Sequence, residues 1–210
     1  IDTSILNGKT MLNIDTEEEG EIYVSSAGGA RIQIDLGIAR DEKILNSSDL
    51  SLKIKGLNGG HSGADIDKNL GNSIKILAFI LSGLSKRFSY KLYDISGGDK
   101  TNAIPREALS ALNISETEKE NFIKEANKLF TEIKADYTKT ETNLTLEIIE
   151  NSEINSAPIS ETDTKKIIDL LCELPNGVMI NSTKIKDLVE TSLSLGVLRT
   201  SKNAITIEML

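Results

Sequence analysis

Apolar and polar side chains alternate through LSLKIKGL (residues 50–57), and the run ends just before the pair Gly59–Gly60. Alternation with a period of two is typical of a strand with one buried face. In the following segment, about 68–86, apolar residues instead recur at helical spacing, at Ile74, Leu77, Ala78, Leu81 and Leu84. The sequence therefore predicts a strand followed by an amphipathic helix.

The same two patterns continue to about residue 150. Alternating apolar residues predict three further strands, at about 88–95, 103–112 and 144–148. A second helix precedes the last of them, and Ser115 with Glu118 has the form of a capping box at its start. The order β-α-β-β-α-β suits the ferredoxin-like arrangement, an antiparallel sheet with helices packed on one face. We therefore predict an α+β fold.

Segments on either side add an additional helix and strands to this unit. A third helix is expected at about 160–173, and strands are expected at about 11–14, 32–36, 189–197 and 204–209. The last alternation runs to the final residue without a closing turn, and the first segment has no evident strand partner. We therefore expect both ends to be cut from something larger.

Composition excludes several classes of protein. The 210 residues carry a net charge of −8 and no basic stretch, which argues against a nucleic-acid partner, because phosphate binding needs clustered Lys and Arg. No apolar run approaches the roughly 18–20 residues of a membrane span, and no signal peptide is visible, so we expect no membrane and a cytoplasmic location. The single cysteine, Cys172, lies in an apolar helical stretch and is interpreted as a packing residue.

Three places could carry chemistry. Asp15 and the acidic run Glu17–Glu19 directly follow an apolar strand, where carboxylates can bind a cation, although the spacing alone favours a solvated acidic turn. His61, the only histidine, lies in Gly-Gly-His-Ser-Gly, whose small residues expose the ring, and an ordinary loop histidine is the alternative. The glycine-rich loop at 97–105 lacks the features of a phosphate loop and could be a plain turn.

Taken together, four stretches resemble the aminoacyl-histidine dipeptidases (Xaa-His dipeptidases), a branch of the carnosinase-like zinc exopeptidases. The stretches are MLNIDTEEEGEIYVSSAGG (11–29), LKIKGLNGGHSGADI (52–66), GGDKTNAIPREA (97–108), and LPNGVMINS with VETSLSLGV (174–182 and 189–197). They follow the order found in the family and spread over nearly the whole chain. The resemblance implies a catalytic domain with two zinc ions and an inserted lid that also dimerises.

The resemblance also implies roles for three residues. Asp15 matches a metal ligand, His61 matches the lid histidine that stabilises the oxyanion, and Asn102 matches a lid residue that binds substrate. The other ligands and the general base lie in segments that this chain lacks. One His and one Cys far apart do not meet the three or four ligands of a zinc site, so we expect this fragment alone to bind no zinc and to be inactive.

These implications define the expected organisation. Residues 1–28 would be the edge of the catalytic domain, and residues 29–210 would be the lid and dimerisation domain, truncated at its C-terminal end. The expected function is hydrolysis of carnosine-like Xaa-His dipeptides by the full-length protein, with the catalytic domain of the same protein and a second copy as partners. The alternatives are the lid of a related metallo-aminoacylase or tripeptidase, and a non-catalytic dimerisation module.

Overall fold

The structure is a computed structural model that describes residues 7–10, 19–20, 22, 26–150 and 154–210. The chain divides into two compact units, residues 1–30 and 31–210. All helices and strands of the described residues belong to the second unit. The strand expected at 11–14 lies outside the described residues.

The predicted ferredoxin-like unit is present. Its strands are neighbours in the order β4-β6-β2-β7, and each neighbouring pair is antiparallel. Along the chain its elements are β2 (Ser47–Lys55), α1 (Ser73–Ser85), β4 (Tyr90–Gly97), β6 (Ala108–Ser115), α2 (Lys119–Ala135) and β7 (Thr145–Glu150). The α+β prediction and its β-α-β-β-α-β order are therefore confirmed.

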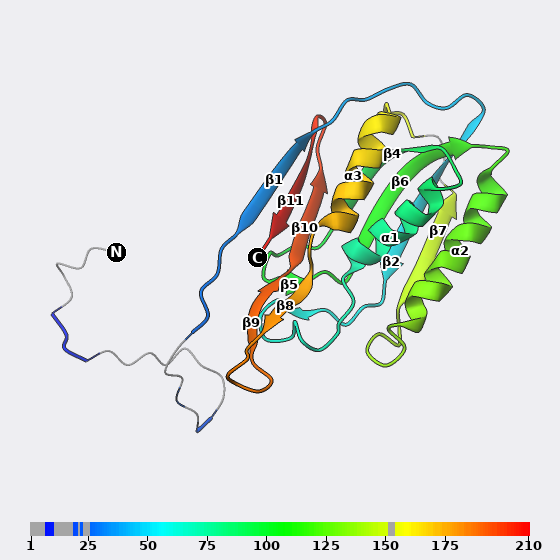
Figure 1. Cartoon of the computed structure of the whole chain (residues 1–210). Coiled ribbons are helices and arrows are strands. Elements are labelled where there is room, and N and C mark those ends of the chain that lie inside the picture. The colour runs from blue at the N-terminus through cyan, green and yellow to red at the C-terminus, as the bar shows by residue number, and fades with distance from the viewer. Residues whose placement is uncertain (1–6, 11–18, 21, 23–25, 151–153) are drawn as a thin grey trace. The chain divides into compact units, whose positions relative to one another are not determined.

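Three strands extend this sheet beyond β4. The seven-stranded sheet has the order β1-β11-β10-β4-β6-β2-β7, with β1 (Ile32–Gly37), β10 (Leu195–Thr200) and β11 (Ala204–Met209) added by antiparallel pairing. The three helices, including α3 (Glu161–Glu173), lie on one face of the sheet (Figure 1). The chain thus adds its first and last strands next to each other at one edge.

Two expected strands are each divided in the structure. The segment 103–112 forms β5 (Ala103–Ile104) and β6, separated around Pro105, which cannot donate a ladder hydrogen bond. The segment 189–197 forms β9 (Val189–Leu193) and the start of β10. Strand β9 pairs in a separate hairpin with β8 (Gly177–Asn181), a strand that the sequence did not predict.

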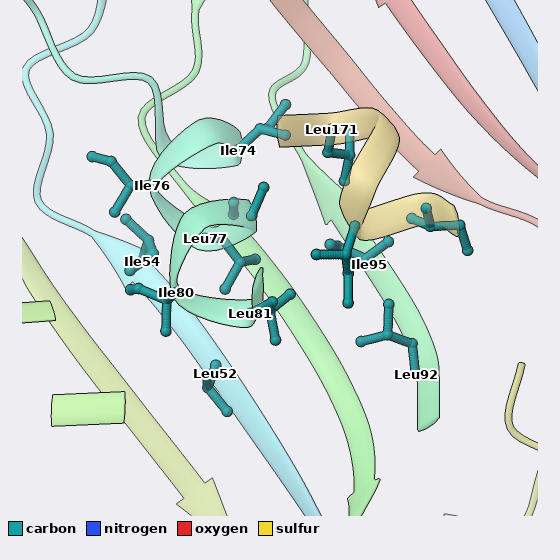
Figure 2. Packing of buried hydrophobic residues seen from close by; sticks show 14 of the residues in the cluster. Leu52, Ile54, Ile74, Ile76, Leu77, Ile80, Leu81, Leu92, Ile95 and Leu171 are labelled. Carbon is teal, nitrogen blue, oxygen red and sulfur yellow. The ribbon is translucent and has the colours of Figure 1, made fainter. Parts of the chain in front are cut away.

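The core lies between the sheet and the helices. Alternate residues of β2, namely Leu50, Leu52 and Ile54, are fully buried against α1, as the alternation predicts. Figure 2 shows Ile54 beside Ile76 and Ile80 of α1, and Leu52 below Ile80 and Leu81. Leu92 and Ile95 of β4 lie on the other side of the helix in the same view. Leu171 brings α3 into the same cluster (Figure 2).

Helix α1 begins later than the apolar spacing predicts. The helix starts at Ser73 rather than near Lys68, because Asn69 has the left-handed backbone angle φ +52° and Asn72 caps the first turn. The Asn72 side-chain oxygen accepts hydrogen bonds from the backbone N–H groups of Ile74 (3.0 Å) and Lys75 (3.2 Å). The residues just before α1 are therefore free to form the loop that carries His61.

The capping box predicted at Ser115 is wrong. Ser115 is the last residue of β6 and pairs with Ser47, and its hydroxyl bonds the hydroxyl of Thr117 at 2.9 Å. Helix α2 begins at Lys119, with Glu118 in the cap position and no capping side-chain hydrogen bond. The strand thus runs through the position where the motif placed a helix start.

Helix α3 is stabilised at both ends by specific side chains. The Ser160 hydroxyl accepts from the backbone N–H of Asp163 at 3.2 Å and so caps the N-terminus. The ammonium group of Lys75 donates to the carbonyls of Leu171, Cys172 and Leu174 at 2.7–2.8 Å. A cation at a helix C-terminus is favourable, so α1 supplies the charge that the last turn of α3 lacks.

Among the described residues, no helix combines the length and the apolar character that crossing a membrane requires.

Candidate functional site

A short ladder brings two of the predicted site residues together. Strand β3 (Gly60–His61) pairs with β5 so that His61 lies opposite Ala103. The backbone N–H of Ser62 donates to the carbonyl of Asn102 at 3.0 Å. His61 and Asn102 are both exposed. Two loops that are distant in sequence are thus joined through their backbones, and one carries His61 while the other carries Asn102.

The imidazole of His61 has a defined orientation. Its Nδ1 atom accepts hydrogen bonds from the backbone N–H groups of Gly63 (3.1 Å) and Ala64 (3.2 Å). In a neutral imidazole one nitrogen accepts and the other carries the proton. The neutral ring therefore carries its proton on Nε2. Because the side chain is exposed, this N–H is the donor available to a substrate.

Asp65 closes the His61 loop on itself. Its Oδ2 atom accepts from the backbone N–H of His61 at 2.7 Å, and its own N–H donates to the His61 carbonyl at 3.0 Å. The hydrogen bond from Lys68 and the His61 N–H lower the pKa of the Asp65 carboxyl. Asp65 was not predicted from the sequence, although its place four positions after the glycine-flanked His61 is visible there.

The glycine-rich loop that carries Asn102 is packed tightly against β10. Gly98 has φ +65°, and a Cβ atom there would lie 2.0 Å from the carbonyl oxygen of Gly196. A Cβ atom on Gly196 would in turn lie 2.7 Å from the Cα atom of Thr101. Real Cβ atoms essentially never come this close to backbone, so only glycine fits at both positions. The loop that carries Asn102 therefore has a defined backbone conformation against β10.

Two pockets flank the pair of site residues. One, of about 530 Å³, is lined by Gly60 and Ala103, which adjoin His61 and Asn102, and by Arg106. The other, of about 410 Å³, is lined by Asn102 together with Arg31, Lys100 and Arg199. The Arg199 guanidinium donates to Asp99 and to the carbonyl of Gly97, each at 3.0 Å, and so braces the Asn102 loop.

The third predicted site residue, Asp15, lies outside the described residues. Within the described ranges, no three His, Cys, Asp or Glu side chains come together as a group that could hold a metal ion. Zinc sites need three or four protein ligands. The described residues therefore do not fit a zinc site by themselves, and any metal would need ligands from elsewhere in the protein.

Cys172 has the packing role that the sequence predicts. Its side chain is half-buried against the core, and its Sγ atom lies 3.5 Å from the carbonyl oxygen of Ala78. Burial raises the pKa of the thiol, which disfavours the reactive thiolate.

Comparison with known proteins assigns the class of this domain. Residues 52–141, which comprise most of the ferredoxin-like unit and the His61 and Asn102 loops, match the family model of the peptidase dimerisation domain. This part of the chain is therefore similar to the peptidase dimerisation domain.

Two relatives define the branch more narrowly. The chain is 35% identical to the cytosol non-specific dipeptidase of Escherichia coli (strain K12) over 206 residues, which is 98% of this chain and 42% of that protein. It also superposes on the crystal structure of aminoacylhistidine dipeptidase from Vibrio alginolyticus with a TM-score of 0.89 and 32% identity, again covering 98% of this chain and 42% of the other. The predicted resemblance to the aminoacyl-histidine dipeptidases is confirmed. The chain spans less than half the length of either relative.

Proposed function

We propose that this chain is the lid and dimerisation domain of a metallo-dipeptidase that hydrolyses Xaa-His dipeptides such as β-Ala-His. The observation that carries the proposal is the geometry of His61, whose Nδ1 atom accepts from two backbone N–H groups and whose exposed ring lies on a loop that is hydrogen-bonded to the carbonyl of Asn102. A histidine held in this way can act as a hydrogen-bond donor at a defined position.

His61 would act on the scissile carbonyl. As water attacks, negative charge develops on the carbonyl oxygen, and a fixed Nε2–H donor stabilises the transition state more than the ground state. The exposed Asn102 carboxamide would hold the bound dipeptide, because it offers both donors and an acceptor on the neighbouring loop. Both groups come from a lid, so the complete site would form only when the lid closes on the catalytic domain.

The rest of the active site would come from the longer protein. Residues 1–28 would be the edge of the catalytic domain, residues 29–210 would be the lid, and Asp15 would be one metal ligand. Two zinc ions would supply Lewis acidity and a water molecule of lowered pKa. The ligand set beyond Asp15 would lie outside this chain.

Self-association and location complete the proposal. The matched domain is named for dimerisation, and we propose that a second copy of the protein binds it. The E. coli relative is named as a cytosolic enzyme, and we propose the cytoplasm here as well. That relative is also named as non-specific, so a dipeptidase of broad specificity is the second candidate function.

The test is the substitution His61→Ala in the longer protein. Removal of one transition-state donor should lower kcat by about 10²–10³-fold, and kcat/KM with it, while metal content and melting temperature stay unchanged. Asp67→Asn, an exposed change in the same loop, is the control and should retain near-normal kcat. A near-normal kcat for His61→Ala would refute the role of His61. Turnover of β-Ala-His against other dipeptides separates the two candidate specificities.

A further inference from the structure

Glu141 is a fully buried carboxylate that is hydrogen-bonded to the loop of His61. It lies in the turn between α2 and β7, with none of its surface exposed. Its Oε2 atom accepts from the backbone N–H of Asn58 at 2.7 Å, and its Oε1 atom accepts from the backbone N–H of Gly71 at 2.9 Å. Asn58 and Gly71 are the two ends of the segment that contains His61. One side chain thus fixes both ends of that segment.

The surrounding contacts fit the same arrangement. The Asn58 side-chain amide donates to the carbonyl of Thr140 at 2.6 Å. Gly56 has φ +83°, and a Cβ atom there would lie 2.0 Å from the carbonyl oxygen of Asn143. The turn between α2 and β7 lies at the same end of the sheet as β5 (Figure 1). The turn therefore forms a base on which the start of the His61 segment rests.

Packing alone does not explain why a carboxylate occupies position 141. A buried carboxylate is costly unless its oxygens accept hydrogen bonds, and an apolar residue would fill the same space at lower cost. Both oxygens here are directed to the ends of a single loop rather than to the neighbouring helix or strand. Within the segment, Asp65 and the Ser62–Asn102 hydrogen bond then determine where the imidazole lies.

We propose that Glu141 is a positioning residue for His61, which it holds in place by fixing both ends of the 58–71 segment. The inference rests on the proposed function only for its catalytic consequence, because the geometric claim can be tested without any activity. Glutamine is nearly isosteric with glutamate but has one acceptor oxygen and one NH₂ group. Glu141→Gln therefore turns one of the two contacts into a donor facing a donor.

The geometric test uses the 210-residue chain, in which the single histidine gives one imidazole signal by NMR. In Glu141→Gln that signal should shift or broaden, and amide exchange of the 58–71 segment should accelerate about tenfold, as expected for one lost hydrogen bond. Glu147→Gln is the matched control, because this carboxylate makes the same change in charge on β7 but is half exposed and paired with Lys55. The control should leave both readouts unchanged.

In the longer protein, Glu141→Gln should lower kcat with unchanged metal content, whereas Glu147→Gln should not. A His61 signal and loop exchange identical to wild type, accompanied only by a lower melting temperature, would overturn the proposal. If the variant does not fold, amide exchange of the wild-type chain tests the proposal instead. The amides of Asn58 and Gly71 should then be the slowest to exchange in the 58–71 segment. Fast exchange of these two amides would overturn the proposal. If the NMR effects appear but His61→Ala retains full activity, the proposed function fails and the positioning role stands.

Discussion

The helix-covered body of the sheet and the end that carries His61 and Asn102 are held together by different forces. The body relies on apolar burial, since the side chains of Leu52, Leu77 and Leu92 are fully inaccessible to solvent. The site end relies on buried polar groups, on Glu141 and Asn72 above all, and on glycines packed against backbone. Apolar burial is non-directional, whereas hydrogen bonds fix position and angle.

Because of this difference, we expect the stability of the domain and the position of its site residues to depend on different side chains. Removing an apolar group from the body should cost free energy of unfolding without moving the imidazole. Altering a polar or glycine position at the site end should move the imidazole or Asn102 at a smaller cost in stability. The following substitutions test that separation, from the largest expected effect on stability to the smallest.

The largest effect is expected for Leu77→Ala in α1. Leu77 is fully buried at the centre of the cluster (Figure 2), so truncation leaves a cavity and should lower the free energy of unfolding by about 2–5 kcal/mol. Urea unfolding measures this change, and Ile185→Ala, at a side chain that is 59% exposed, should have little effect. A displaced His61 NMR signal in folded Leu77→Ala would show that apolar packing in the body also determines the position of the imidazole.

A smaller effect on stability, with a direct effect on the site, is expected for Gly98→Ala. The new Cβ atom would overlap the carbonyl oxygen of Gly196 at a positive φ, so the loop should shift at a cost of about 1–3 kcal/mol. Gly37→Ala is the control, because no atom lies within 4 Å of its added Cβ. Amide chemical shifts of Thr101 and Asn102 should change only in Gly98→Ala. Unchanged shifts in that variant would show that the loop is not braced by this contact.

The smallest expected effect is on the pH dependence of the free energy of unfolding, and it comes from the carboxylate of Asp49 in β2. Burial alone would raise the pKa of Asp49, but hydrogen bonds from the Ile154 N–H, Asn113, Tyr93 and Lys43 outweigh it and lower the pKa. This stabilisation is complete above the unfolded pKa of about 3.9 and is lost as the pH falls through the lower folded value. Asp49→Asn should therefore make the free energy of unfolding less sensitive to pH between 5 and about 2. An unchanged pH profile would show that the ionised Asp49 carboxylate does not stabilise the folded state.

The sequence predicted the body well for a physical reason. Burial of one face imposes a period of two on strands and a helical period on α1, and both periods are legible at Leu50–Ile54 and Ile74–Leu84. The shift in the alternation of apolar residues within β4 could not be predicted from the sequence. A bulge between Leu92 and Asp94 shifts the alternation, so that Leu92 and Ile95 both join the core although they are three residues apart, and the hydroxyl of Tyr93 between them donates to Asp49.

The site was predictable only in part. The glycine-flanked His61 and the loop of Asn102 are visible as motifs, but their proximity depends on the β3–β5 ladder, which joins residues far apart in sequence. Glu141 lies in the polar stretch Lys139–Asn143, which reads as an exposed loop, so nothing local marks it as buried. The exposed hairpin strand β8 likewise lacks the apolar alternation that a buried face would impose.

The fold of this domain holds His61 as an Nε2–H donor. The most direct measurement is the nitrogen NMR spectrum of the single imidazole in the 210-residue chain at alkaline pH, where the neutral ring can be assigned to one tautomer. Because the Gly63 and Ala64 amides donate to Nδ1, we predict a proton on Nε2 and a bare Nδ1. A proton on Nδ1, or an even mixture of the two tautomers, would contradict the account.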